Sequence, residues 1–331
     1  MPLLIMGSPR SGTTFLSQMV NRFLDHHVSR DNGTLLRFHR LLGRYEPLGN
    51  DGNLRRLIHD LYCDHFFTTR IRQRGMSLSE PQLFDRVRTR TYAGLIEAIF
   101  QANAEQHGKR HWGYKRASLG RAQGAHIDDL FPTARFVHII RDARDVVLSM
   151  RNTPKVLLER SWHFAAADWV SHVEAGRRLG RDLGNDRYLE VRYEQFMAEP
   201  VRTLTTIFEF VGAGDDGAER VARIGNELGR LIKRDTVEKW RRTMPPHALK
   251  TVERQAGALM QELGYPVVNV DVIRQPVSIP ELAWLHADRI ARNLLTRSIP
   301  MMVRYRFELL KARRRSSAAE ADRKSQFSSA S

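Results

Sequence analysis

The sequence predicts an α/β fold in which a mostly parallel β-sheet is flanked by helices on both faces. Two observations carry this prediction. Short apolar runs alternate along the chain with stretches in which apolar residues recur every three or four positions, and these periods are typical of buried strands and amphipathic helices. Such alternation implies crossover connections between parallel strands, with helices on both faces. A chain of 331 residues is long enough for one such domain with an appendage or for two modest domains.

The chain opens with a predicted strand, a tight loop and a helix. Leu3–Met6 is fully apolar and ends at Gly7, as expected of a buried parallel strand. We interpret His26 and His27 as residues that close the following helix near the negative end of its dipole. That helix is predicted from apolar residues at helical spacing, which are Phe15, Leu16, Met19, Val20, Phe23 and Leu24.

Three further strands are expected. Arg135–Ile140 is the clearest, and it runs into Asp142, which suits the N-cap of a helix over 143–151. His111–Lys115 is a weaker strand candidate, and Arg187–Tyr193 is another. Helical spacing predicts the later helices, which are Val201–Val211 and segments within 216–263.

The chain is expected to divide into a core and an appendage. Residues 1–275 are predicted to form the core domain, with a helical insertion over 45–110 that is rich in Arg and Gly. The prolines near 276 and 280 mark its end. Residues 281–315 are predicted to be a basic amphipathic helical appendage, and the Ser/Ala-rich tail 316–331 to be disordered.

Composition limits the environment and the partners. The formal net charge of +16, with a pI near 10.6, attracts nucleic acid, acidic glycans, anionic lipid or charged cofactors and selects none of them. Cys63 is the single cysteine, so an internal disulfide and a cysteine-built zinc site are excluded. No stretch approaches the ~20 apolar residues of a membrane span, and the first apolar run is too short for a signal peptide. We therefore expect a cytoplasmic protein.

The first motif is the loop Gly7–Thr14, which lies between the first strand and the first helix. Such a loop directs backbone N–H groups into one concavity at the positive end of a helix dipole, where an anion binds. The ATP-binding version of the loop carries a lysine where this chain has Thr13. Arg10 supplies a cation instead. A nucleotide is favoured and a magnesium–NTP complex is disfavoured; a plain surface turn is the alternative.

A second motif, Ile140–Ser149, reads IRDARDVVLS. Together with Pro9–Thr14, it resembles the sulfotransferases that use 3′-phosphoadenosine 5′-phosphosulfate (PAPS), among them bacterial stand-alone enzymes and the tyrosylprotein and heparan-type branches. The resemblance covers roughly residues 3–265. It fades over 45–110 and is absent after Pro280. It implies a P-loop-like fold, PAPS as co-substrate and no required metal.

The resemblance also implies how the nucleotide is held. Arg141 and Ser149 fall where the family binds the 3′-phosphate, although an ion pair of Arg141 with Asp142 or Asp145 is an alternative. The 5′-phosphosulfate is expected on the loop residues Arg10, Ser11, Gly12, Thr13 and Thr14.

Two later residues are candidates for the same ligand. Tyr193 falls where the family has a tyrosine near the nucleotide, with a buried strand-end tyrosine as the alternative. Lys239 lies in a lysine–tryptophan stretch that resembles the family's closing segment, whereas Trp240 is expected to pack in the core. Arg144 is either a further ligand or a simple surface residue.

Sulfuryl transfer is close to phosphoryl transfer, in which the protein mainly positions reactants and stabilises charge. By resemblance, Lys115 neutralises the leaving oxygen, although Arg116 and the two residues after it depart from the family pattern. Asp31 falls where related branches place their base; a turn residue is the alternative, and Glu46 is the second candidate.

The acceptor is expected to be a carbohydrate or glycolipid hydroxyl, with protein tyrosine and small phenols or alcohols left open. The segment Leu282–Lys311 mixes apolar residues with arginines. It could contact an anionic membrane or pack on its own domain. The rival functions are a P-loop kinase, a nucleic-acid-binding module, which the dispersed basic residues disfavour, and an inactive glycan- or lipid-binding relative. We expect no nucleic-acid partner.

Overall fold

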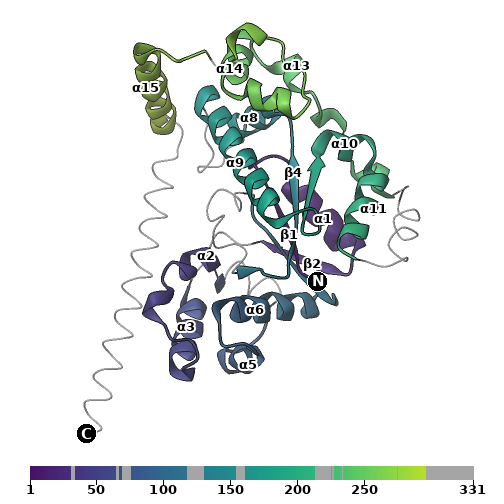
Figure 1. Ribbon diagram of the computed structural model, residues 1–331, viewed down its shortest axis with the longest axis vertical. Helices are drawn as coiled ribbons and strands as arrows, with labels where there is room; N and C mark the ends of the chain where they lie inside the picture. The colour runs from purple at the N-terminus through teal and green to yellow at the C-terminus, as the bar shows by residue number, and fades with distance from the viewer. Residues whose placement is uncertain are drawn as a thin grey trace.

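The computed structural model of the chain describes residues 1–30, 34–64, 67–68, 76–117, 130–153, 161–212, 225, 227–232, 234–273 and 275–295. Within them, five parallel strands form one sheet in the order β2-β3-β1-β4-β5 (Figure 1). The strands are β1 (Leu3–Gly7), β2 (His26–Arg30), β3 (His111–Lys115), β4 (Arg135–Ile140) and β5 (Tyr188–Arg192).

Helices cover both faces of this sheet (Figure 1). They are α1 (Thr13–Phe23), α2 (Thr34–His39), α3 (Asp51–Cys63), α5 (Glu80–Arg86), α6 (Tyr92–Gln106), α8 (Ala143–Arg151), α9 (Trp162–Leu183), α10 (Tyr193–Ala198), α11 (Pro200–Phe210), α13 (Trp240–Thr243), α14 (Pro246–Glu262) and α15 (Ile279–Leu295), with the 3₁₀ helices η1 (Leu42–Arg44), η3 (Arg234–Thr236) and η4 (Val270–Val272).

The central strand β1 is buried on both faces, so its alternate side chains enter two different cores. Leu4 and Met6 pack in the core formed with α3, α5 and α6. Leu3 and Ile5 pack in the opposite core, with α1, α10 and α11. A third core joins Ile140, at the end of β4, to α8, α9 and α14. All four β1 side chains are at most 1% exposed, which fixes the strand and the loop that follows it.

The predicted α/β fold is confirmed, and β3, β4 and α8 have the bounds expected from the sequence. The interpretation of His26 and His27 is wrong, because they begin strand β2 and do not close α1. Only Val28 in β2 has a strongly apolar side chain. An edge strand buried by its neighbours does not need a continuous apolar run.

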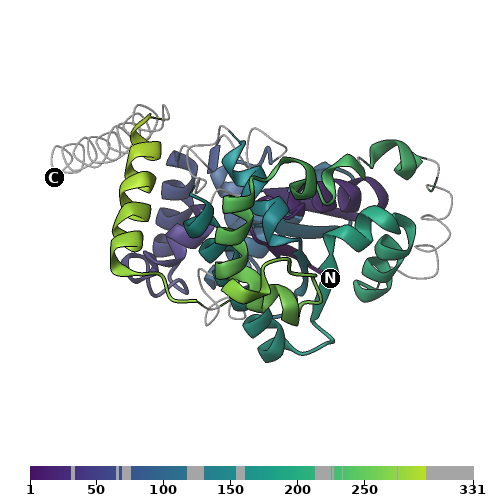
Figure 2. The same cartoon turned by 90° about the horizontal axis from the view of Figure 1, so that it is seen from above.

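The elements described between 42 and 106 are helical; an insertion over 45–110 within the core domain stays a prediction. The predicted appendage is described as far as Leu295, where α15 ends; the tail 316–331 lies outside the described residues. Seen from above, α15 lies at one end of the molecule (Figure 2). None of the described helices combines the length and the apolar character needed to cross a membrane.

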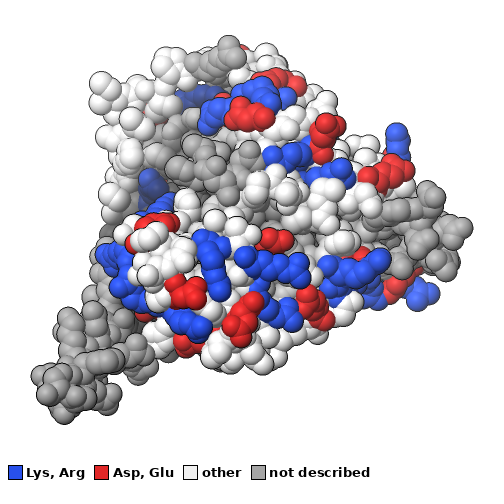
Figure 3. Space-filling view, turned by 60° about the horizontal axis from the view of Figure 1, so that its bottom comes forward, with Lys and Arg blue, Asp and Glu red and all other residues white. Residues whose placement is uncertain are grey.

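The charged surface is mixed in sign despite the excess of basic residues. On the face shown in Figure 3, Lys and Arg side chains alternate with Asp and Glu side chains. Arg86 pairs with Glu105, and Arg202 pairs with Glu199. Exposed pairs of this kind contribute little to stability, but they divide the positive surface into smaller areas.

Candidate functional site

The loop between β1 and α1 closes tightly because two of its residues have left-handed backbone angles. Gly12 has φ of 96°. A Cβ on Gly12 would lie 2.5 Å from the Tyr193 ring, so glycine serves both the turn and the packing. Arg10 has φ of 73°, and Glu238 is the other described non-glycine residue with positive φ, at 51°. Unfavourable backbone angles concentrate at functional sites, and these two flank one site.

The loop presents hydroxyl groups at the start of α1. Ser11 is fully buried, and its Oγ has no hydrogen-bond partner among the described residues. Thr13 and Thr14 begin α1, and Thr14 Oγ1 accepts a hydrogen bond from Lys115 Nζ at 3.2 Å. A buried hydroxyl without a partner is rare in a folded protein. Ser11 therefore fits a ligand with oxygen acceptors at this helix N-terminus.

Arg141 follows β4 and lies against the loop. It is 8% exposed, and its guanidinium donates hydrogen bonds to the carbonyl oxygens of Arg10, at 3.3 Å, and Thr236. Its Nη2 is 3.5 Å from the Asp145 carboxylate, so the expected alternative, an ion pair, is present. Its Cζ lies 4.4 Å from the Tyr193 ring centroid. Its buried Nε has no partner within the described residues.

The two sequence motifs meet directly, 139 residues apart in the chain. Arg10 Nε donates a hydrogen bond of 3.0 Å to Ser149 Oγ. Partial burial and then the positive charge of Arg141 lower the pKa of Arg10. Arginine keeps its proton even so. Two fixed positive charges side by side stabilise a bound anion.

Thr236 is a residue of this site that the sequence did not reveal. Its Oγ1 forms a hydrogen bond of 2.8 Å with the Tyr193 hydroxyl, and its carbonyl oxygen accepts from Arg141. Thr236 thus connects η3 to Tyr193 and Arg141, two of the residues predicted to bind the nucleotide. Its position three residues before Lys239 is the sequence feature that could have indicated a place in this site. Lys239 is exposed at the N-cap of α13.

The interpretation of Arg144 as a surface residue is wrong. Its side chain is 1% exposed and pairs with Asp142, at 2.6 Å, and with Glu253, at 2.8 Å. Its Cζ lies 3.6 Å from the ring centroid of Trp240, which is buried as expected. Glu253 is 109 residues further along the chain, so no local pattern could reveal this pair. Arg144 braces α8 against α13 and α14 behind the site.

Asp145 links this brace to Arg141. Its Oδ1 accepts a hydrogen bond of 2.9 Å from the Trp240 backbone N–H, while its other oxygen faces Arg141. Burial raises the pKa of the Asp145 carboxyl, and the nearby positive charge of Arg141 opposes this shift. The carboxylate therefore sets the position of Arg141 relative to the segment that carries Lys239.

The structure describes two of the three candidate catalytic residues, Lys115 and Glu46. Lys115 ends β3 and is paired in register with Arg30, the last residue of β2. Asp31, the predicted base, lies outside the described residues. Glu46 is exposed, and its carboxylate accepts a hydrogen bond of 3.1 Å from the Leu48 N–H in its own turn. The structure thus joins Lys115 to the loop and leaves Glu46 on the helical insertion.

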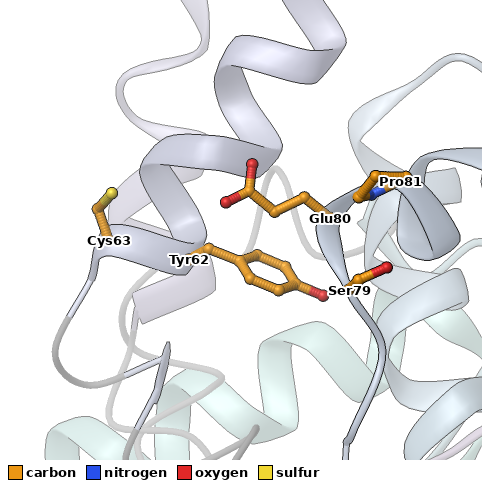
Figure 4. Close-up of a pocket in the computed structure, with 5 residues that line it drawn as sticks. All are labelled: Tyr62, Cys63, Ser79, Glu80 and Pro81. Carbon is orange, nitrogen blue, oxygen red and sulfur yellow. The ribbon is translucent and has the colours of Figure 1, made fainter.

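A separate open hollow of about 460 Å³ lies on the helical insertion, between α3 and α5 (Figure 4). Cys63 contacts His59 Nε2 at 3.5 Å, and His59 Nδ1 lies 3.1 Å from Glu80. The hollow is lined by Tyr62, Cys63, Ser79, Glu80 and Pro81, none of which belongs to the loop or to the Arg141 motif.

Known proteins are similar in sequence to this chain. Residues 2–216 match the model of the sulfotransferase family. Carbohydrate sulfotransferase 5 of Mus musculus is 26% identical over 179 residues, 44% of this chain and 45% of that protein. The protein-tyrosine sulfotransferase of Drosophila melanogaster is 20% identical over 290 residues, 81% of this chain and 53% of that protein. The chain spans about half the length of these two relatives.

A solved structure has the same fold. The sulfotransferase domain from the Synechococcus PCC 7002 olefin synthase superposes with a TM-score of 0.56 and 24% identity, over 81% of this chain and 96% of that one. This likeness confirms the P-loop-like α/β fold. The family model covers more than half of the chain, and this chain therefore belongs to the sulfotransferase family.

Proposed function

We propose that this chain is an enzyme that transfers a sulfuryl group from PAPS to an acceptor hydroxyl by in-line displacement. One observation carries the proposal. The loop and the Arg141 motif meet through the 3.0 Å hydrogen bond between Arg10 and Ser149, with Arg141 bound to the loop carbonyl. Two guanidinium groups that follow the adjacent strands β1 and β4, together with the Ser149 hydroxyl of α8, suit a ligand with two separate anionic groups. PAPS, the donor that this family generally uses, has that character.

The proposed donor site uses the residues expected from the sequence. Arg141 and Ser149 would hold the 3′-phosphate, and Tyr193 and Lys239 would border the nucleotide. The buried Ser11 Oγ and Arg141 Nε have no partner among the described residues, which supports the fit of an anionic ligand. The 5′-phosphosulfate would lie on Arg10, Ser11, Gly12, Thr13 and Thr14.

Transfer requires groups that stabilise charge and remove a proton. When bound, PAPS supplies the activated sulfuryl group. We assign Lys115 to the oxygen that gains charge as the sulfur–oxygen bond breaks, since its ammonium already bonds Thr14 of the loop. We assign Asp31 to the acceptor proton, because Arg30, the residue before it, is paired with Lys115.

We further propose a carbohydrate or glycolipid hydroxyl as acceptor. The net charge of +16 favours an acidic glycan or an acceptor at an anionic surface. One relative is named a carbohydrate sulfotransferase and another a protein-tyrosine sulfotransferase, so tyrosine is the first alternative. Alternation of basic and acidic side chains on the face in Figure 3 supports the expectation of no nucleic-acid partner.

The test of donor binding is thermal unfolding in the presence of EDTA with 3′,5′-phosphoadenosine, ATP or 5′-AMP. A ligand that binds only the native state adds about 2.7 kcal/mol at one hundred times its dissociation constant. We expect a clear rise in Tm with 3′,5′-phosphoadenosine and little with the other two. The control is Arg178→Ala, an exposed arginine of α9, which should keep the full shift. Stronger stabilisation by magnesium–ATP would favour the kinase alternative.

The acceptor is tested by transfer of labelled sulfuryl from PAPS to a panel of acidic oligosaccharides, glycolipids and tyrosine peptides. We expect transfer to the sugar-bearing acceptors. Transfer to tyrosine peptides alone would overturn the choice of acceptor and leave the reaction intact. Nucleotide binding without transfer to any member would support the inactive binding relative.

A further inference from the structure

Helix α15 is held to the rest of the protein along one side. Leu285 is buried, at 6% exposure. Arg289 lies over the Phe164 ring of α9, at 4.7 Å from its centroid, and Glu281 forms an ion pair with Arg254 of α14. These contacts set the position of the helix at the end of the molecule (Figures 1 and 2).

The other side of α15 is apolar and exposed. Ala283, Ala287 and Ala291, which are spaced four residues apart, are exposed along it. Helical geometry places them in one arc between the large apolar side chains. Four of the seven exposed large hydrophobic side chains among the described residues belong to this helix, namely Ile279 at 85%, Leu282 at 38%, Trp284 at 64% and Ile290 at 59%. We call these four the outer face of α15.

The sequence that continues from this helix is strongly basic. Residues 292–315 contain eight Lys or Arg residues and one acidic residue, Glu308. Basic clusters next to an amphipathic helix bind anionic lipid headgroups. The eight are Arg292, Arg297, Arg304, Arg306, Lys311, Arg313, Arg314 and Arg315.

We propose that the outer face of α15 docks on an anionic membrane surface and holds the enzyme there. The outer face enters the boundary between headgroups and acyl chains, and the basic sequence that continues from α15 favours an anionic over a neutral surface. Trp284 suits this interface, because its indole is apolar with one polar N–H. The family model ends at residue 216, so the surface lies outside the matched region. It is independent of the proposed reaction.

Charge and shape together favour lipid over a protein partner. The outer face is a ridge on one helix, without a partner groove in the described part of the chain. A membrane takes up such a ridge without shape complementarity. The net charge of +16 adds long-range attraction to an anionic surface, which salt weakens.

The experiment is co-sedimentation of the full chain with vesicles of phosphatidylcholine, with or without phosphatidylserine. We expect binding to the serine-containing vesicles that weakens as salt rises. The double substitution Trp284→Ser with Ile290→Ser should lower the partition coefficient about ten-fold or more, since two exposed apolar side chains no longer enter the lipid. The matched control is Val268→Ser with Val270→Ser, which removes two side chains of similar exposure, 60% and 57%, from outside α15.

Trp284 also serves as a spectroscopic reporter. We expect its fluorescence to shift to the blue with phosphatidylserine vesicles, and Trp284→Phe should lose the shift while keeping the sedimentation. Unchanged Tm and 3′,5′-phosphoadenosine binding in each variant would show an intact fold. A wild-type chain that ignores the vesicles at low salt would overturn the proposal. An equal loss of vesicle binding in both double variants would also overturn it. So would self-association or oligonucleotide binding that is abolished by Trp284→Ser with Ile290→Ser while vesicle binding persists.

Discussion

The two ends of the β-sheet each bring basic side chains close together, but one end has arginines and the other has histidines. At the carboxyl ends of β1 and β4, Arg141 lies against Arg10 of the loop. At the amino ends of β2 and β3, His26 and His111 are paired in register, with ring centroids 4.9 Å apart. Arginine cannot release its proton, whereas histidine can. Crowded arginines therefore call for a bound anion, and crowded histidines become neutral.

At the histidine end of the sheet, the crowded histidines are neutral. Burial, more than the neighbouring charges, lowers the pKa of His26 to about 4. Burial, and after it the charge of the nearby His107, lowers the pKa of His27 to about 4. His26 Nε2 donates to the Met1 carbonyl oxygen at 3.0 Å. The neutral ring suffices for that bond. We therefore propose that the arginine end is a ligand site and the histidine end a structural one, and the following predictions test this difference.

The largest expected effect concerns the buried brace behind the arginine end. Arg144→Ala should lower the free energy of unfolding by about 3–5 kcal/mol, because it leaves Asp142 and Glu253 as buried, poorly compensated charges. Denaturant unfolding measures the change. The control Arg178→Ala, on an exposed site, should stay within about 0.5 kcal/mol. Equal effects in the two variants would show that Arg144 does not brace the site.

The next effect is on the chemical step. Lys115→Ala should lower kcat about 10²–10³-fold with little change in 3′,5′-phosphoadenosine affinity, because its ammonium acts on charge that develops in the transition state. Steady-state kinetics and calorimetry separate the two. Lys250→Ala, an exposed lysine of α14, is the control. A Lys115→Ala variant with normal kcat and weak nucleotide binding would instead make Lys115 a simple binding residue.

The base is tested by the same assay. Asp31→Asn should lower kcat strongly, because the amide cannot accept the acceptor proton. Glu46→Gln is the matched variant on the helical insertion and should retain activity. The opposite outcome would transfer the role to Glu46.

The sequence predicted the arginine end better than the histidine end. The loop and the Arg141 motif follow the apolar strands β1 and β4, so both their positions and their meeting at one sheet edge could be expected. Strand β2 reads HHVSR and has no apolar run. Its pairing depends on β3, in which His111, the register partner of His26, lies 85 residues later. Thr236 and Glu253 act through partners 95 and 109 residues away, and local patterns do not encode such contacts. The cytoplasmic location stays a prediction.

A smaller effect distinguishes the two phosphates of the ligand. Arg141→Ala should weaken 3′,5′-phosphoadenosine binding by about 1.5–3 kcal/mol, the contribution of hydrogen bonds to a charged group. Binding of 5′-AMP should change less, because it lacks the 3′-phosphate. Calorimetry with both nucleotides measures this difference, and Arg141→Lys should restore only part of it, since lysine lacks the bidentate fork. Equal losses for both nucleotides would argue against a 3′-phosphate site at Arg141.

The smallest effect tests the neutral histidine end. The folded-state pKa of His26, about 4, lies below its ordinary value near 6.5, so protonation favours the unfolded chain. The neutral ring's contribution is therefore complete above about pH 6.5 and is lost as the pH falls toward 4. At pH 5.5 the loss for this buried group is about 1 kcal/mol relative to pH 8. Its Nδ1 is buried without a partner among the described residues, so an added proton there has no acceptor in them.

His26→Gln isolates that contribution. Glutamine can still donate toward the Met1 carbonyl but does not titrate, so its free energy of unfolding should fall less between pH 8 and 5.5 than that of the wild type, by about 1 kcal/mol. The groups near His26 are His111, the Met1 amino group and Asp25, and all three are kept in the variant. At the arginine end, by contrast, the guanidinium groups keep their charge throughout this range. Identical pH profiles for both proteins would mean that the pKa of His26 is the same in the native and unfolded states, and the contrast between the two sheet ends would then fail.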